Sequence, residues 1–164
     1  MKLIVMRHGE AEASNTSDKT RNLTAYGRRQ ATDAGKWLAT VLGNSDISLA
    51  LVSPYTRTQQ TCECLNTVLN IKQKVDVAEL VPNAKAYITH VVLDGFLREN
   101  PTLDSVILVS HMPLISFLLD ELLSNRQASL FDTSSMAIID YDINTNSGVL
   151  KAFYHPCMQQ FELK

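Results

Sequence analysis

Short apolar runs alternate along this chain with longer segments in which apolar residues recur at helical spacing. A continuous apolar run is typical of a strand that is covered on both faces. The pattern predicts strands over residues 2–6, 48–52, 74–78, 105–109, 136–142 and 149–154. It predicts helices over residues 24–42, 53–69, 83–99 and 113–123.

Capping residues mark the ends of two of these helices. Thr24 and Ser53 are expected N-caps because a short polar side chain can accept from the free N–H groups of the first turn. Pro54 fits that first turn, and Gly43 is the expected end of the first helix. Alternation of strands and helices indicates an α/β fold, a three-layer sandwich with a mostly parallel central sheet and helices on both faces. A turn at residues 144–148 would join the last two strands at its edge.

Length and composition limit the classes of protein. With 164 residues and 45% hydrophobic content, the chain fits a single domain over residues 1–164 that buries its own core. A net charge of -2 argues against a broad nucleic-acid surface. No apolar stretch approaches the roughly 20 residues that span a bilayer. The three cysteines show no zinc spacing or disulfide framework, so reduced thiols in a cytoplasmic protein are expected. No assembly element is evident, and a monomer is the expected state.

Histidines and arginines follow three of the predicted strands directly. Arg7 and His8 follow the first strand, Arg57 lies on the first turn of the helix after the second, and His111 follows the strand at 105–109. Parallel strands place their carboxyl ends at one edge of the sheet, where open α/β sheets bind ligands. We therefore expect the four side chains to converge.

The convergent groups suit a phosphoryl group. Arginine forks match phosphate oxygens, helix N-termini attract anions, and Gly9 lets the backbone approach closely. Each residue alone also has a structural interpretation: Arg7 as a surface ion pair, His8 as a loop histidine and Ser53-Pro54 as a simple helix start. The repeated placement at one end of the sheet favours the functional interpretation.

Four motifs resemble the histidine phosphatase superfamily, which includes phosphoglycerate mutases and acid phosphatases. The motifs are Met6-Arg7-His8-Gly9-Glu10, Leu23-Thr24-x-x-Gly27-x-x-Gln30-Ala31, Val52-Ser53-Pro54-Tyr55-x-Arg57-Thr58-x-Gln60-Thr61 and Val109-Ser110-His111. Their order and spacing agree across nearly the whole chain. The short length and the segments around Arg21, Glu79 and His111 most resemble the SixA type of bacterial protein-histidine phosphatase.

The resemblance implies a phosphoglycerate mutase-like fold and a metal-independent phosphatase without cofactor. His8 would attack phosphorus and carry the phosphoryl group, while Arg7, Arg57 and His111 hold its oxygens. His111 would serve best when protonated, a form that bound phosphate favours. Arg21 is either a substrate contact or a solvated loop arginine.

No general acid is evident in the sequence. Glu79 is the foremost candidate, with Asp76 and Glu10 as alternatives, and each is also an ordinary surface charge. A phosphohistidine substrate has less need of an acid, because its imidazole can leave neutral once the ring is protonated. The resemblance thus implies a phosphohistidine on a partner protein domain as substrate. A small-molecule phosphomonoesterase and a non-catalytic module that binds phosphorylated partners are the alternatives.

Overall fold

The computed structural model describes residues 1–13 and 17–156 and contains a six-stranded sheet in the order β5-β3-β6-β1-β7-β8. The strands are β1 (Lys2–Arg7), β3 (Leu49–Val52), β5 (Lys74–Asp76), β6 (Ser105–Ser110), β7 (Met136–Asp142) and β8 (Ser147–Tyr154). β5, β3, β6 and β1 run parallel, whereas β7 is antiparallel to β1 and β8 to β7. The sheet is therefore mixed, with the predicted parallel centre and hairpin edge.

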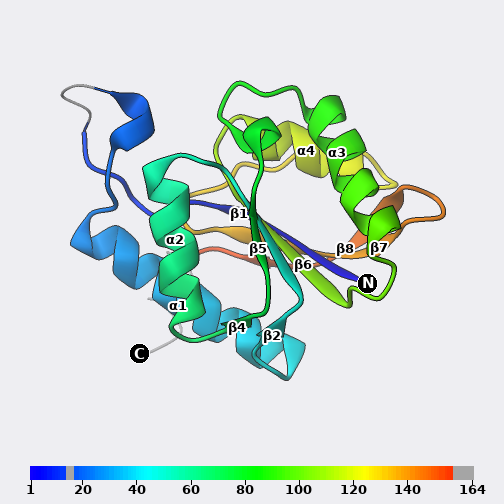
Figure 1. Ribbon diagram of the computed structural model, residues 1–164, viewed down its shortest axis with the longest axis horizontal. Helices are drawn as coiled ribbons and strands as arrows, with labels where there is room; N and C mark the ends of the chain where they lie inside the picture. Colours follow the sequence, from blue (N-terminus) through cyan, green and yellow to red (C-terminus); the bar gives the residue numbers. More distant parts are fainter. Residues whose placement is uncertain (14–16, 157–164) are drawn as a thin grey trace.

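Helices cover both faces of this sheet (Figure 1). They are α1 (Ala25–Leu42), α2 (Thr56–Asn66), α3 (Ala86–Glu99) and α4 (Leu114–Leu122). Alternate strand residues point to opposite faces, so β1 sends Leu3 and Val5 into the core under α3 and α4, and Ile4 and Met6 into the core under α1 and α2. The predicted three-layer α/β architecture is confirmed.

Helix α1 is capped as its sequence predicts. The Thr24 hydroxyl accepts from the Gly27 N–H at 2.9 Å, and Gly43 ends the helix with a φ of 72°. The expectation for Ser53 is wrong, because α2 begins at Thr56 with Tyr55 at the N-cap position. The Ser53 hydroxyl lies 2.7 Å from Nε2 of His111 instead. The side chain that was expected to cap the helix therefore contacts a residue that is distant in the sequence.

Several short elements carry no periodic signal and were not predicted. Strands β2 (Asp46–Ile47) and β4 (Asn70–Ile71) form a small parallel pair. The 3₁₀ turns η1 (Asp18–Thr20) and η2 (Ala78–Leu80) lie on either side of them in the chain. Helix α2 also stops at Asn66 rather than residue 69, and α3 starts at Ala86 rather than residue 83.

Two glycines bring the start of α1 against the segment after β1. A Cβ on Gly9 would lie 2.5 Å from the carbonyl oxygen of Gly27, and a Cβ on Gly27 would overlap the backbone of Glu10. Glycine at both positions is therefore needed for this close approach. The contact fixes the loop that carries His8 against a helix.

The structure also bears on the state of the cysteines and on membrane-spanning helices. Cys62 and Cys64 are buried free thiols, as expected, while Cys157 lies outside the described residues. Within residues 1–13 and 17–156, no helix combines the length and apolar character that a bilayer crossing requires.

Candidate active site

The carboxyl ends of β1, β3 and β6 bring His8, Arg57 and His111 together, as the sequence predicts. Nε of Arg57 donates to Nε2 of His8 at 3.2 Å, and the His8 and His111 rings lie 5.2 Å apart between centroids. All three side chains are nearly enclosed, with 6%, 3% and 1% of His8, Arg57 and His111 exposed. The cluster forms the compact floor of the site at this edge of the sheet, and Arg57 makes this floor cationic.

Hydrogen bonds fix the tautomer of His8. An arginine Nε is always a donor, so Nε2 of His8 must accept and present a lone pair. Nδ1 then carries the proton and donates to the carbonyl oxygen of Gly9 at 2.7 Å. The acceptor that orients the ring is thus a backbone carbonyl, which the sequence alone did not identify.

The electrostatic environment keeps His8 neutral. Burial lowers the pKa of His8 to about 3, and the charges of Arg57, Arg7 and Arg21 add to the shift against the opposing bond to Gly9. Near pH 7 the imidazole is therefore unprotonated, and Nε2 has the electron pair that a nucleophile needs.

His111 is held by Ser53 and Tyr55. Its Nε2 contacts the Ser53 hydroxyl, and the Tyr55 ring lies 5.0 Å away in an edge-on arrangement. Burial lowers the pKa of His111 to about 2, helped by His8 and the arginines, so the ring is neutral without a bound anion. Nδ1 is buried and has no hydrogen-bond partner among the described residues.

Arg7 lies at the same edge and leaves a second polar atom unsatisfied. Its Nη1 donates to the Phe131 carbonyl at 2.7 Å, while its buried Nε has no described partner. The buried hydroxyls of Ser134 and Ser135 are also without one. Ser134 donates its N–H to the His8 carbonyl and has a φ of 61°, and Ser135 accepts from the Arg7 N–H.

These unsatisfied atoms have a common location. Arg7, His111, Ser134 and Ser135 surround the end of β1 and are the residues of the described chain with buried, unpartnered side-chain polar atoms. Buried polar groups are otherwise nearly always paired. A polar ligand at this edge would supply the missing partners. Ser134 and Ser135 were missed in the sequence because a loop serine carries no periodic or motif signal.

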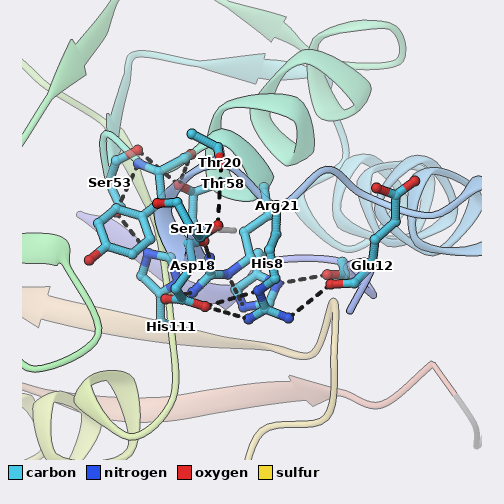
Figure 2. A network of polar contacts seen from close by, with 12 residues as sticks. His8, Glu12, Ser17, Asp18, Thr20, Arg21, Ser53, Thr58 and His111 are labelled. Carbon is cyan, nitrogen blue, oxygen red and sulfur yellow. Dashed lines mark hydrogen bonds and ion pairs between the residues drawn. The ribbon is translucent and has the colours of Figure 1, made fainter. Parts of the chain in front are cut away.

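Asp18 joins two arginines above this floor. Its carboxylate accepts from Nη2 of Arg57 at 3.2 Å and from Nε of Arg21 at 2.9 Å, and its carbonyl accepts from Nη1 of Arg57 at 2.7 Å. Figure 2 shows Asp18 beside Arg21 and His8. Partial burial opposes the shift, but the two arginines lower the pKa of Asp18, so the carboxylate is charged. Arg21 therefore belongs to the cluster, and Asp18 is a further residue that the sequence did not single out.

None of the three acid candidates is hydrogen-bonded to His8, Arg57 or His111 in the described part of the chain. The Glu79 carbonyl accepts from Thr89, and its carboxylate has no hydrogen bond or ion pair in the described part of the chain. Hydrogen bonding from Gln59, with Lys74, lowers the pKa of Asp76. The Glu10 carboxylate accepts from the Thr24 hydroxyl at 2.9 Å and is exposed.

Across residues 1–13 and 17–156, no group of three or more His, Cys, Asp or Glu side chains could hold a metal ion. The donor set at the cluster is instead cationic and neutral, with Asp18 already paired. This chemistry suits a multiply charged oxyanion.

A family model and two relatives are similar to this chain in sequence. Residues 3–80 match the histidine phosphatase superfamily (branch 1). A phosphohistidine phosphatase SixA homolog of Haemophilus influenzae is 36% identical over 152 residues, which cover 88% of this chain and 90% of the relative. The phosphohistidine phosphatase SixA of Escherichia coli is 31% identical and is matched over 96% of this chain and 95% of its own.

A solved structure shows the same architecture. The protein histidine phosphatase SixA complexed with tungstate superimposes with a TM-score of 0.88 at 29% identity, covering 97% of this chain and 99% of that one.

Proposed function

This chain belongs to the histidine phosphatase superfamily (branch 1), and we propose that it is a phosphohistidine phosphatase that removes the phosphoryl group from a histidine of a partner protein. The observation that carries the proposal is the state of His8. Its Nε2 holds a lone pair at neutral pH, inside a cluster of Arg7, Arg57 and His111. Binding an anion would not need a nucleophile there, which argues against a purely binding module.

The two relatives and the structural match support this choice of substrate. Both relatives are named phosphohistidine phosphatases and are matched over nearly their whole length. The matched SixA structure holds tungstate, a tetrahedral oxyanion with the shape of phosphate. The unsatisfied donors around β1 suit such an anion.

The reaction follows in two steps. In the free protein, His8 and Asp18 accept hydrogen bonds from the N–H groups of Arg57. The phosphoryl oxygens replace them as acceptors, and the lone pair of His8 Nε2 becomes free. Nε2 then forms a bond to phosphorus as the bond to the substrate imidazole breaks, and the leaving ring departs neutral with its own proton. Water attacks phospho-His8 next, releasing inorganic phosphate and restoring His8.

Charge stabilisation is the main contribution of the other residues. Charge spreads over the equatorial oxygens in the transition state, and Arg7, Arg57 and His111 surround that position. The negative phosphoryl group would also raise the proton affinity of His111, so its ring can donate to an oxygen when substrate binds. Arg21 would contact the same group once Asp18 moves away.

A general acid is dispensable in this scheme. The leaving imidazole needs no proton from the enzyme once its ring is protonated. The leaving group of an alkyl or aryl phosphate, by contrast, is an alkoxide or aryloxide anion, whose departure is assisted by an acid that protonates it. In the described residues, no hydrogen bond holds the Glu79 carboxylate in such a position.

The proposal treats residues 1–164 as one domain, monomeric and cytoplasmic, and independent of metal or cofactor. The two cores, which pack on opposite faces of the same sheet, support the single domain.

The test is phosphate release from a histidine-phosphorylated phosphotransfer domain and from an aryl phosphate, with His8→Ala as control. We expect fast release from the domain, little from the ester, and none above background from the variant. Fast release from the ester alone would favour a small-molecule phosphomonoesterase. Equal rates for the parent and His8→Ala would exclude His8 as the nucleophile.

A further inference from the structure

Two large apolar side chains are exposed in segments that adjoin residues of the active site. Phe117 on α4 is 61% exposed, and Leu130 in the following loop is 80% exposed. They lie in adjoining segments, because the hydroxyl of the preceding residue Ser116 donates to the carbonyl of Ser129 at 2.8 Å. We call Phe117 and Leu130 the apolar rim.

The apolar rim borders the groups that would bind the phosphoryl group. Leu130 is followed by Phe131, whose carbonyl accepts from Nη1 of Arg7. Phe117 lies on the first turn of α4, the helix that begins three residues after His111. Both rim residues are thus tied through short stretches of backbone to the cationic floor.

The depth of the site indicates which part of a substrate would contact the apolar rim. His8 is 6% exposed and His111 only 1%, so a phosphohistidine has to insert its side chain to reach Nε2. A histidine side chain is short, and the backbone that carries it would follow it to the mouth of the site. Residues at the mouth must then contact the carrier.

We infer that the apolar rim is the docking surface for the folded protein domain that carries the phosphohistidine. The inference rests on the proposed function and adds the surface that selects the substrate. Single exposed apolar residues are common and need no explanation, but a pair at the mouth of a deep site is removed from water whenever a protein substrate enters.

The chemistry of the rim defines the complementary surface. Next to Phe117, the carboxylates of Asp120 and Glu121 are paired with Arg126 at 3.1 and 3.5 Å, so they do not call for a charged partner. The segment is also held in place, because the Phe131 ring packs 4.9 Å from that of Phe153. A fixed apolar surface loses little conformational freedom on binding, and it fits a carrier with apolar side chains around its phosphohistidine.

The experiment compares two substrates across three proteins. The proteins are the full chain, Phe117→Ala/Leu130→Ala, and the control Val41→Ala/Val149→Ala. Val41 and Val149 are 46% and 54% exposed and lie on α1 and β8, away from the residues described for the site. The substrates are a histidine-phosphorylated phosphotransfer domain and free phosphohistidine.

We expect the rim variant to lose about tenfold or more in kcat/KM on the phosphorylated domain, the scale for truncating interface anchors. Its kcat/KM on free phosphohistidine, and both values of the control, should stay within about twofold of the parent. Unchanged kcat/KM on the domain would overturn the docking surface. Equal losses on both substrates would also overturn it, because the rim would then act inside the pocket. If the parent itself leaves the domain phosphorylated, the proposed function fails instead.

Discussion

Arg57 is fully engaged in the free site, before substrate arrives. Its Nε donates to His8, and both terminal nitrogens donate to Asp18. A phosphoryl group can bind this guanidinium only by replacing those acceptors. The Asp18 carboxylate therefore occupies the position that the phosphoryl group of the substrate takes when it binds. The carboxylate carries one negative charge, and the phosphoryl group carries more.

Asp18→Asn tests this competition. Removing the charge should strengthen binding of inorganic phosphate, up to about tenfold, because a carboxylate at hydrogen-bond distance from two arginines opposes a second anion and each ~1.4 kcal/mol is a factor of ten. The measurement is the inhibition constant of phosphate, with Asp33→Asn as control, since Asp33 pairs with Lys36 in an exposed position. A lower kcat without tighter phosphate binding would show that Asp18 only orients Arg57.

The two buried histidines predict a dependence of stability on pH. Burial lowers the pKa of His8 to about 3 and that of His111 to about 2 in the folded protein. The unfolded chain then binds more protons below pH 6.5, so the free energy of unfolding falls as the pH drops, by at most about 1.4 kcal/mol per pH unit for each histidine.

Urea unfolding at pH 7, 6 and 5 measures this slope. We expect the parent to lose stability more steeply than His8→Gln/His111→Gln, since the carboxylates that titrate are the same in both. Parallel slopes would mean that these histidines titrate alike in the folded and unfolded states.

Sequence predicted some of these residues and missed others for a physical reason. His8, Arg57 and His111 could be placed together because each follows a strand of strong apolar character, and parallel strands end at one edge. Asp18 lies on a 3₁₀ turn and pairs with Arg57, which is 39 positions away in the sequence. Ser134 adopts a left-handed conformation in a loop. No period or spacing marks such contacts before the chain is folded.

Among the elements, the contact between α1 and the segment after β1 has the least room. Gly27→Ala would drive a Cβ into the Glu10 backbone, next to the loop that positions His8. We expect a loss of about 1–3 kcal/mol in the free energy of unfolding, the scale of overpacking, and a lower kcat because the loop must move.

Gly95→Ala is the matched control for that change. Gly95 also lies in a helix, α3, but a Cβ there meets open space. Alanine should stabilise this helix by about 0.5–1 kcal/mol and leave kcat unchanged. Urea unfolding and turnover measured on both variants check the pair, and similar stability changes would refute the close approach of α1.

Element prediction succeeded where the chain offered a long pattern. The runs at 2–6 and 105–109 became β1 and β6, buried on both faces. β2 and β4 have two residues each, too few to show a period. The predicted start of α2 was wrong because the Ser53 hydroxyl contacts His111 and does not cap the helix. A tertiary contact, and not local propensity, determines the position of this side chain.

At the scale of the whole molecule, the unsatisfied buried polar side-chain atoms of the described residues gather at one end of the sheet. The unpartnered atoms of Arg7, His111 and Ser134 lie at the carboxyl end of β1. Away from it, Tyr141 on β7 donates to Asp94 at 2.6 Å, and Nε2 of His90 lies 2.7 Å from the same hydroxyl. This second network joins α3 to the sheet and leaves its hydroxyl fully engaged.

Tyr141→Phe should therefore affect stability without affecting catalysis. It removes the hydroxyl shared by His90 and Asp94, and a buried hydrogen-bonding group left without its partner costs about 1–3 kcal/mol. For a chain of this length each kcal/mol lowers Tm by roughly 2–4 °C. We expect a clear fall in Tm, unchanged kcat/KM at 25 °C, and neither effect in Tyr26→Phe, since Tyr26 is 37% exposed on α1. A loss of kcat/KM with Tm intact would show instead that the network at β7 controls the site, and that stability and function are not divided between the two ends of the sheet.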